Sequence, residues 1–260
     1  MTRLVAMLLF ASALAPGSAT RAQAVPESAG GQPTRGLALQ AALSMGVGSL
    51  SFVRPTPAGT QQLPDTPFAA SGIELRAQAW REAPLALEVL AAYQTSIGLE
   101  LQLEPLFALP ERVDVRTQRI ELGAAPILRL GQGPHAPSLA APLGLVFRAF
   151  LPEQPQPALP EHVLGGPALR VELRLPLGEW VELRAGPEAQ WIMLIDSSLR
   201  RENACCHGVA LGGQASAETS IGSPLRVGLA YRESHAFVPA VDWRFKDVER
   251  FLTLRIAGEL

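Results

Sequence analysis

The sequence predicts an all-β fold, an antiparallel up-and-down barrel of about ten strands. Two observations predict it. Apolar and polar residues alternate with a period of two along most of the chain, and the segments between the alternating runs are in turn short and long. Alternation with period two is typical of strands that have one apolar and one polar face. Alternating short and long connections indicate neighbouring strands that run up and down in sequence order.

The N-terminal segment has the three parts of a secretory signal peptide. Arg3 supplies the positive charge, Leu4–Leu14 form the apolar stretch, and Ala22-Gln23-Ala24 is a small-x-small cleavage site. The apolar stretch is too short to cross a bilayer as a helix. We therefore expect residues 1–24 to be a signal peptide cleaved after Ala24. Residues 25–35 are expected to be a flexible lead, and residues 36–260 the barrel.

Composition narrows the class of protein. The chain is 48% apolar and 18% charged, which excludes a disordered chain. Its 22 basic and 24 acidic residues give a net charge of −2, so no broad cationic surface is available for nucleic acid. After the signal peptide, no window of about 18 uninterrupted apolar residues predicts a membrane-spanning helix.

The last nine residues show the strand pattern plainly. Leu252, Leu254, Ile256 and Leu260 occupy one face, and Thr253, Arg255 and Glu259 occupy the other. The other clear runs are residues 37–47, 73–79, 85–93, 169–175, 181–195 and 225–231. Residues 95–109 could form an additional strand. That strand would make the count odd and move the C-terminus to the other end, so we assign them to the strand that begins at Leu85.

The connections fall into two classes. Short turns are expected near residues 82–84, 131–137, 176–179 and 222–224. Longer segments, rich in proline or polar residues, are expected near residues 54–67, 104–112, 151–164, 196–205 and 238–247. This arrangement places both chain termini at the end of the barrel where the short turns lie.

In this pattern the sequence resembles the bacterial outer-membrane β-barrel proteins over residues 36–260. Their strands alternate, their periplasmic turns are short, their external loops are longer, and apolar residues alternate to the end of the last strand. Here Leu252, Leu254, Ile256 and Leu260 match that last feature, although the final residue is leucine instead of the usual aromatic residue. Prolines also occur inside predicted strands, at Pro126, Pro142, Pro167 and Pro187, where we expect bulges or strand ends.

The resemblance implies an outer-membrane location, a monomer, contacts with outer-membrane lipids and lipopolysaccharide, and insertion by the barrel-assembly machinery. Aromatic residues at predicted strand ends agree with anchoring at the membrane interfaces. They are Trp80 and Trp180 near the short turns, and Tyr93, Trp191 and Tyr231 toward the long loops.

A soluble periplasmic β-barrel, with the apolar face as its core, is the alternative fold. Three features favour the membrane barrel. The charged face consists of arginine and glutamate, since Lys246 is the only lysine, and it is interspersed with glycine. The apolar face is mainly leucine, alanine and valine. A narrow lumen needs this mixture of small residues and paired long charges.

The membrane barrel turns its charged face into the lumen. The expected lumen charges are Glu74, Arg76, Glu88, Arg119, Glu121, Arg129, Arg148, Arg170, Glu172, Arg174, Glu182, Arg184, Glu188, Glu218, Arg226 and Arg255. Arginine pairs with carboxylates through two parallel hydrogen bonds, which offsets the cost of desolvation. Side chains fill most of the lumen of a barrel of about ten strands. We expect a salt-bridged plug, with a narrow passive pore as the alternative.

Motifs of catalysis are missing. The sequence has no G-x-S-x-G, no H-E-x-x-H and no P-loop, so we expect a non-enzymatic protein without a cofactor or a metal. One alternative remains at the outer rim, where His207 and His235 could join Asp196 and Asp242. Such a site would resemble the ten-stranded outer-membrane proteases in strand count and residue types, with these side chains activating water.

The predicted outer loops contain two further candidates. Arg200, Arg201, Arg244 and Lys246 place four cations near one rim, where they could contact the phosphates of lipopolysaccharide. Cys205 and Cys206 are adjacent, so they could form a strained disulfide, remain two thiols or link to another chain.

Overall fold

The computed structural model describes residues 37–56, 59–80, 84–103, 111–132, 135–153, 161–197, 207–222, 224–239 and 244–259, all within the compact unit Pro33–Leu260. The predicted signal peptide and lead lie outside the described residues. The strands are β1 (Leu37–Thr56), β2 (Gly59–Ala79), β3 (Leu85–Ile97), β4 (Leu99–Leu103), β5 (Glu111–Arg129), β6 (Ser138–Ala140), β7 (Leu143–Pro152), β8 (His162–Arg170), β9 (Glu172–Leu177), β10 (Val181–Ile192), β11 (Leu194–Ser197), β12 (Gly208–Gly222), β13 (Leu225–Pro239) and β14 (Arg244–Glu259).

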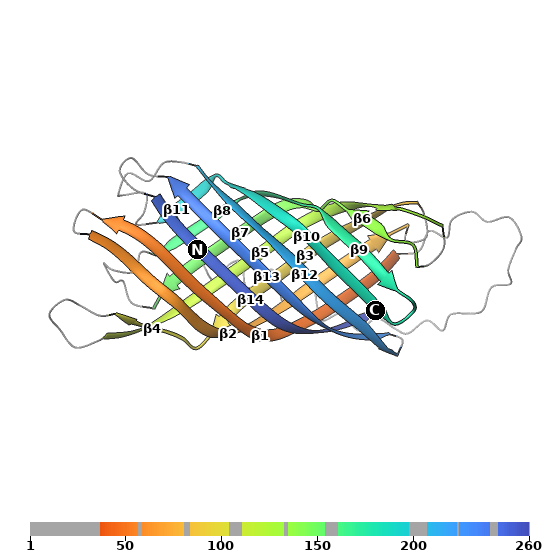
Figure 1. Cartoon of the computed structure of the whole chain (residues 1–260), viewed down its shortest axis with the longest axis horizontal. Helices are drawn as coiled ribbons and strands as arrows, with labels where there is room; N and C mark the ends of the chain where they lie inside the picture. The colour runs from red at the N-terminus through yellow and green to blue at the C-terminus, as the bar shows by residue number, and fades with distance from the viewer. Residues whose placement is uncertain are drawn as a thin grey trace, which may run out of the picture. The chain divides into compact units, whose positions relative to one another are not determined.

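These segments form a closed antiparallel barrel of ten strands, which confirms the predicted fold (Figure 1). Four barrel strands consist of two segments each: β3 with β4, β6 with β7, β8 with β9, and β10 with β11. The first and last strands close the barrel, because β1 pairs with β14 from Gln40↔Glu259 to Val53↔Lys246. Among the described residues, no helix has the length and apolar character needed to span a membrane.

The two ends of the barrel differ. At one end, which we name the short-turn end, β1 begins, β14 ends and a three-residue turn joins β9 to β10. The opposite end is the long-loop end. The connection predicted at 54–67 is wrong, because β1 and β2 continue as a paired hairpin as far as Thr56↔Gly59. The pairing of β1 with β2 has one register shift, between Leu50 and Phe52, and continues beyond it. The backbone N–H and C=O groups of the polar residues in this hairpin therefore hydrogen-bond across the two strands.

Prolines lie where a strand changes its partner. Pro142 separates β6 from β7. Pro126 lies between the part of β5 that pairs with β7 and the part that pairs with β6. Pro187 lies between the parts of β10 that pair with β9 and with β8, and Pro167 between the parts of β8 that pair with β11 and with β10. Because proline has no N–H to donate, it fits where the ladder is already interrupted.

Gly98 explains why residues 95–103 add no eleventh strand. It separates β3 from β4 with a φ of 60°, and both segments pair with β5. The extra residue reverses the direction of the following side chains, as a bulge does. Ile97 is therefore exposed, whereas Leu99 and Leu101 are fully buried inside the barrel.

The polarity of the strands inverts toward the long-loop end. Over most of the barrel, the outward side chains are apolar and exposed, as for Leu43, Leu75, Leu229 and Leu254. Near the long-loop end the inward side chains are apolar instead, and polar ones face outward. The inward set, which we name the apolar layer, comprises Leu50, Phe68, Ala70, Leu99, Leu101, Val113, Val115, Phe150, Leu164, Ile192, Ala210, Ala236, Val238 and Phe251. The outward polar side chains include Glu100, Asp114, Arg116, Glu233 and Arg250.

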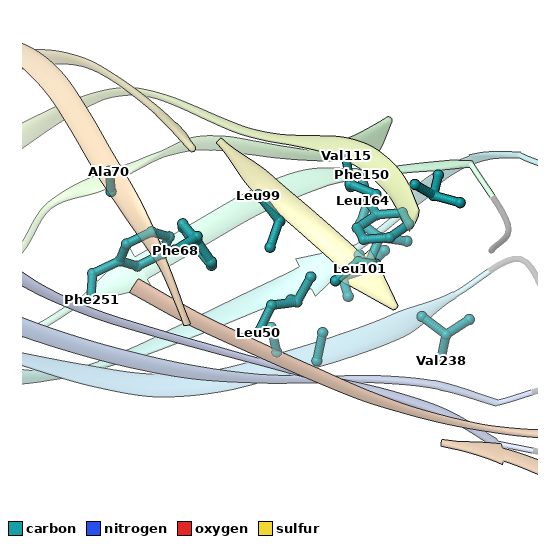
Figure 2. Close-up of a cluster of buried hydrophobic side chains, with 14 residues drawn as sticks. Leu50, Phe68, Ala70, Leu99, Leu101, Val115, Phe150, Leu164, Val238 and Phe251 are labelled. Carbon is teal, nitrogen blue, oxygen red and sulfur yellow. The ribbon is translucent and has the colours of Figure 1, made fainter. Parts of the chain in front are cut away.

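The apolar layer receives side chains from all ten barrel strands (Figure 2). The rings of Phe68 and Phe251 meet edge to face with 5.7 Å between centroids, a favourable aromatic geometry. Leu101 and Leu164 have no exposed surface. This end of the barrel is thus built like a soluble β-barrel, with an apolar interior and a polar exterior.

We expect Gly98→Ala to lower the free energy of unfolding by about 1–2 kcal/mol, because alanine disfavours a positive φ. Gly258→Ala is the matched control. A Cβ added at either position meets no atom within 4 Å, but only Gly98 has a positive φ. Urea titration of the purified barrel measures both variants. Equal stabilities would show that the bulge conformation imposes no cost.

Candidate functional site in the barrel lumen

The sequence-predicted lumen charges lie on the inward faces of their strands, because side chains alternate between the two faces of a sheet. Eleven of them are buried: Glu88, Arg119, Glu121, Arg148, Arg170, Glu172, Arg174, Arg184, Glu188, Glu218 and Arg255. Glu74, Arg76, Arg129, Glu182 and Arg226 are partly exposed. The strands that carry them surround the lumen, so carboxylates and guanidinium groups meet across it.

One group of ion pairs occupies the half of the lumen nearer the short-turn end. Arg174 is its best-bound member. Its Nη1 and Nη2 donate to the two carboxylate oxygens of Glu88 at 2.9 and 2.8 Å, and its Nε donates to Glu172 at 2.7 Å. Arg255 donates to both Glu74 and Glu218. A planar guanidinium that binds carboxylates through several donors gives the strongest ion-pair geometry in proteins.

A second group lies nearer the middle of the lumen. Arg119 Nη2 donates to Glu188 at 2.8 Å, and Arg170 Nη2 lies 2.9 Å from Glu121. Arg232 binds both carboxylates, with its Nη1 3.1 Å from Glu121. These contacts join β5, β8, β10 and β13 across the lumen.

Gln214 connects the two groups. Its Oε1 accepts from Arg170 at 2.9 Å, and its Nε2 donates to Glu172 at 2.6 Å. The ion pairs therefore form one network along the lumen axis. Chains of such hydrogen bonds in a low-dielectric interior strengthen one another.

Sequence reasoning missed Arg232, Gln214, Glu249, Asp247 and Ser234. Arg232 is an even number of residues from Arg226 on the same strand, and Glu249 is an even number from Arg255, so each pair shares the inward face. Extending the alternation along these two strands would have identified Arg232 and Glu249. The apolar layer conceals this signal, because apolar residues such as Phe251 interrupt the polar face near the long-loop end.

Arg148 marks the boundary between the network and the apolar layer. It donates to Ser234 across the lumen, and its Nη1 lies 3.5 Å from Glu249. His162 is also buried at this level, with its ring stacked on Phe150 at 5.2 Å between centroids. The lumen thus changes from charged to apolar within the barrel.

The predicted rim residues are not brought together in the described part of the chain. His235 faces outward, and its Nε2 lies 2.8 Å from Glu233. It pairs with Leu211, four residues from His207, so the two histidines are separated by about 13 Å along the strand. The side chain of Asp196 and the whole of Asp242 lie outside the described residues. Among the described residues, no cluster of three metal-binding side chains occurs.

The outward face near the long-loop end has a polar cluster of its own. Glu233 accepts from Tyr231 at 2.7 Å and from Arg250 at 3.2 Å, and Arg250 also donates to Asp65 at 3.1 Å. Among the predicted lipopolysaccharide contacts, Lys246 is exposed, with its Nζ 5.9 Å from the ring centroid of Phe237. Arg200, Arg201, Cys205, Cys206 and the side chain of Arg244 lie outside the described residues.

Comparison with solved structures relates this barrel to bacterial outer-membrane proteins. The chain is similar to the outer-membrane protease OmpT from Escherichia coli, with a TM-score of 0.51 and 12% identity over 90% of this chain and 99% of that chain. It also matches Ail, the attachment invasion locus protein of Yersinia pestis (TM-score 0.28, 9% identity, 83% of this chain and 97% of that chain). A third match is the Neisserial surface protein A (TM-score 0.30, 12% identity, 84% of this chain and 99% of that chain). No protein-family model and no curated protein sequence matches the chain. At these identities the likeness shows the fold alone.

We expect Arg174→Met to lower the free energy of unfolding by about 3–5 kcal/mol, because it leaves buried carboxylates without their partner. Combining it with Glu88→Leu should cost less than the sum of the two single variants, since the pair is removed together. Urea unfolding of the purified barrel measures the cycle. Arg226→Met is the control. Its ion pair is longer, at 3.4 Å from Glu182, and partly exposed, so about 1 kcal/mol or less is expected. An additive cycle would show that Arg174 and Glu88 do not depend on each other.

Proposed function

We propose that this chain, which has the fold of the bacterial outer-membrane β-barrel proteins, is a non-enzymatic outer-membrane protein with a closed lumen. Its role would lie in envelope structure or in binding through its outer surface. The observation that carries the proposal is that a salt-bridged network and the apolar layer follow one another along the lumen.

The outward surface supports the membrane location. Exposed leucine, isoleucine and valine side chains surround the barrel, and exposed aromatic residues occur at both of its ends. Trp80 and Trp180 lie near the short turns, and Trp191 and Tyr231 lie toward the long loops. Such girdles are typical of the headgroup regions. A soluble periplasmic barrel would instead place its arginine and glutamate side chains in water, whereas most are buried inside here.

The inverted polarity of the strands near the long-loop end also supports the membrane location. From Tyr231 toward the long-loop end the outward side chains become polar, including Glu233 and Arg250. This change is expected where a barrel leaves the hydrocarbon and enters the headgroup region and water. Insertion by the barrel-assembly machinery and a monomeric state belong to the same proposal.

Two layers of different chemistry support a closed lumen and disfavour the narrow pore. An ion that crossed the barrel would have to displace paired charges and then pass the apolar layer, where Leu101, Leu164 and Val238 have no exposed surface. Desolvating an ion in an apolar constriction is strongly unfavourable.

Lipopolysaccharide is the proposed partner at the outer rim. The exposed Lys246 and the outward polar cluster around Glu233 lie just beyond the aromatic residues, at the level of lipid headgroups. Arg244, at the start of β14, and Arg200 and Arg201, which lie outside the described residues, are the other cations proposed for this rim. Arginine and lysine bind phosphate through charge-assisted hydrogen bonds.

The first test is conductance. Purified protein in planar bilayers is expected to give no conductance steps, while a trimeric porin prepared in the same way gives them. Heat-modifiable migration of the same sample, recovered from the outer-membrane fraction, verifies that the barrel is folded and correctly located. Regular single-channel steps from folded protein would favour the pore, and absence from the outer membrane would overturn the location.

The second test is binding to purified lipopolysaccharide. A variant with glutamine at Arg200, Arg201, Arg244 and Lys246 is expected to bind less than the wild type at low salt, where charge interactions are least screened. The difference should shrink at physiological salt. Arg116→Gln, an exposed position on β5, is the control and should bind as the wild type does. Equal binding by the four-residue variant and the wild type at low salt would end the proposal for this rim.

A further inference from the structure

Two carboxyl side chains are buried together at the long-loop side of the charged network. Asp247 and Glu249 point inward from β14, on one face and about 7 Å apart along the strand. Asp247 is 4% exposed and Glu249 is 6% exposed. In register, Asp247 lies between Phe52 of β1 and Ala236 of β13, and Glu249 lies opposite Ser234 of β13. None of these neighbours carries a charge, so the pair must find its counter-charge across the lumen.

One guanidinium serves both carboxyl groups. Arg148 on β7 reaches across the lumen, donates to Ser234, and has its Nη1 3.5 Å from Oε2 of Glu249. Among the described residues, Glu249 and Arg148 are the charged groups that act on Asp247. His162, which is also buried near this end, is not one of them. Two acidic groups therefore share a single cation.

Each carboxyl group keeps an oxygen that receives no hydrogen bond. Oδ1 of Asp247 and Oε2 of Glu249 have no hydrogen-bond partner within the part of the chain that the structure describes. An ionised carboxylate that is buried without such a partner is so unfavourable that the group becomes neutral instead. With both carboxylates ionised, two negative charges and the one positive charge of Arg148 would leave a net charge of −1. One proton brings this charge to zero and supplies the missing donor.

We propose that Asp247 and Glu249 hold one proton between them at neutral pH, which makes the long-loop end of the barrel sensitive to pH. The proton resides on Asp247, because Glu249 lies beside the guanidinium of Arg148 and is stabilised there as an anion. The protonated oxygen of Asp247 then donates to the free oxygen of Glu249. Loss of the proton places two like charges side by side in a low-dielectric interior, where carboxyl pairs do not both ionise readily.

The proton couples the stability of the barrel to pH. The folded chain holds it, whereas an aspartate in the unfolded chain releases it at about pH 4. Unfolding therefore releases a proton, so the free energy of unfolding falls as the pH rises above about 4. The fall ends at the pH at which Asp247 ionises in the folded barrel as well.

Unfolding in urea at a series of pH values tests this coupling. Relative to Asp247→Asn, the unfolding equilibrium constant of the wild type should rise up to about tenfold for each pH unit above about 4, because asparagine has no proton to lose. Asp114→Asn, at an exposed position on β5, is the matched control and should follow the wild type at every pH. All three proteins contain His162, so its titration cancels in the comparison. A difference between the wild type and Asp247→Asn that does not change with pH would overturn the proposal.

Infrared spectroscopy locates the proton and keeps the proposal testable if Asp247→Asn does not fold. At neutral pH the wild type is expected to show the C=O band of a protonated carboxylic acid, shifted when the aspartate carboxyl groups carry ¹³C. Asp247 is the buried aspartate among the described residues, which assigns the band. In Glu249→Gln the band should disappear at a lower pH than in the wild type, because the like charge is gone and Arg148 remains. Absence of the band at neutral pH, or a band that the label does not shift, would overturn the proposal.

Discussion

Most charges that strand alternation turns inward find a partner inside the barrel, and this constraint organises the structure. A carboxylate or guanidinium in a closed lumen loses its hydration, so it is stable only when an opposite charge and enough hydrogen bonds replace the water. Arginine meets that requirement with five donors in a fixed plane, which explains why lysine is almost missing from the chain. Several pairs join strands that are not neighbours in the sheet, as Arg119 on β5 does with Glu188 on β10. The lumen thus supplies lateral restraint that the backbone ladder alone does not provide.

Because strand polarity inverts, the barrel has two regions that differ in which kind of side chain faces inward. In the lower region, apolar residues face outward and charges face inward. Near the long-loop end, Val113 and Val115 face inward while Asp114 and Arg116 face outward, the arrangement of a soluble barrel. One strand can belong to both regions because its side chains keep alternating between the two faces. Only the polarity of the residues on each face is exchanged. As a result of this exchange, the interior of the upper region is apolar and adjoins the charged interior of the lower region.

Strand direction and the inward charges were predictable because alternation is a local property that a single sequence displays. Arg174 and Glu188 could be placed inside the barrel from parity alone. Three features could not be predicted in this way. The reversal at Gly98 depends on one backbone angle, the β1–β2 hairpin depends on cross-strand pairing of polar residues, and the apolar layer depends on which ends of the strands meet. The partner of each charge was also hidden, because Arg148 reaches Ser234 across the lumen from a distant part of the chain.

Closure by β14 has a consequence for the order of assembly. Arg255 on this last strand donates to Glu74 on β2 and to Glu218 on β12, so it is a partner for both flanks of the seam. Until β14 is in place, both carboxylates lie one strand away from an open edge and lack this guanidinium. Docking of the final strand therefore completes the backbone ladder and brings this guanidinium to both carboxylates in the same step.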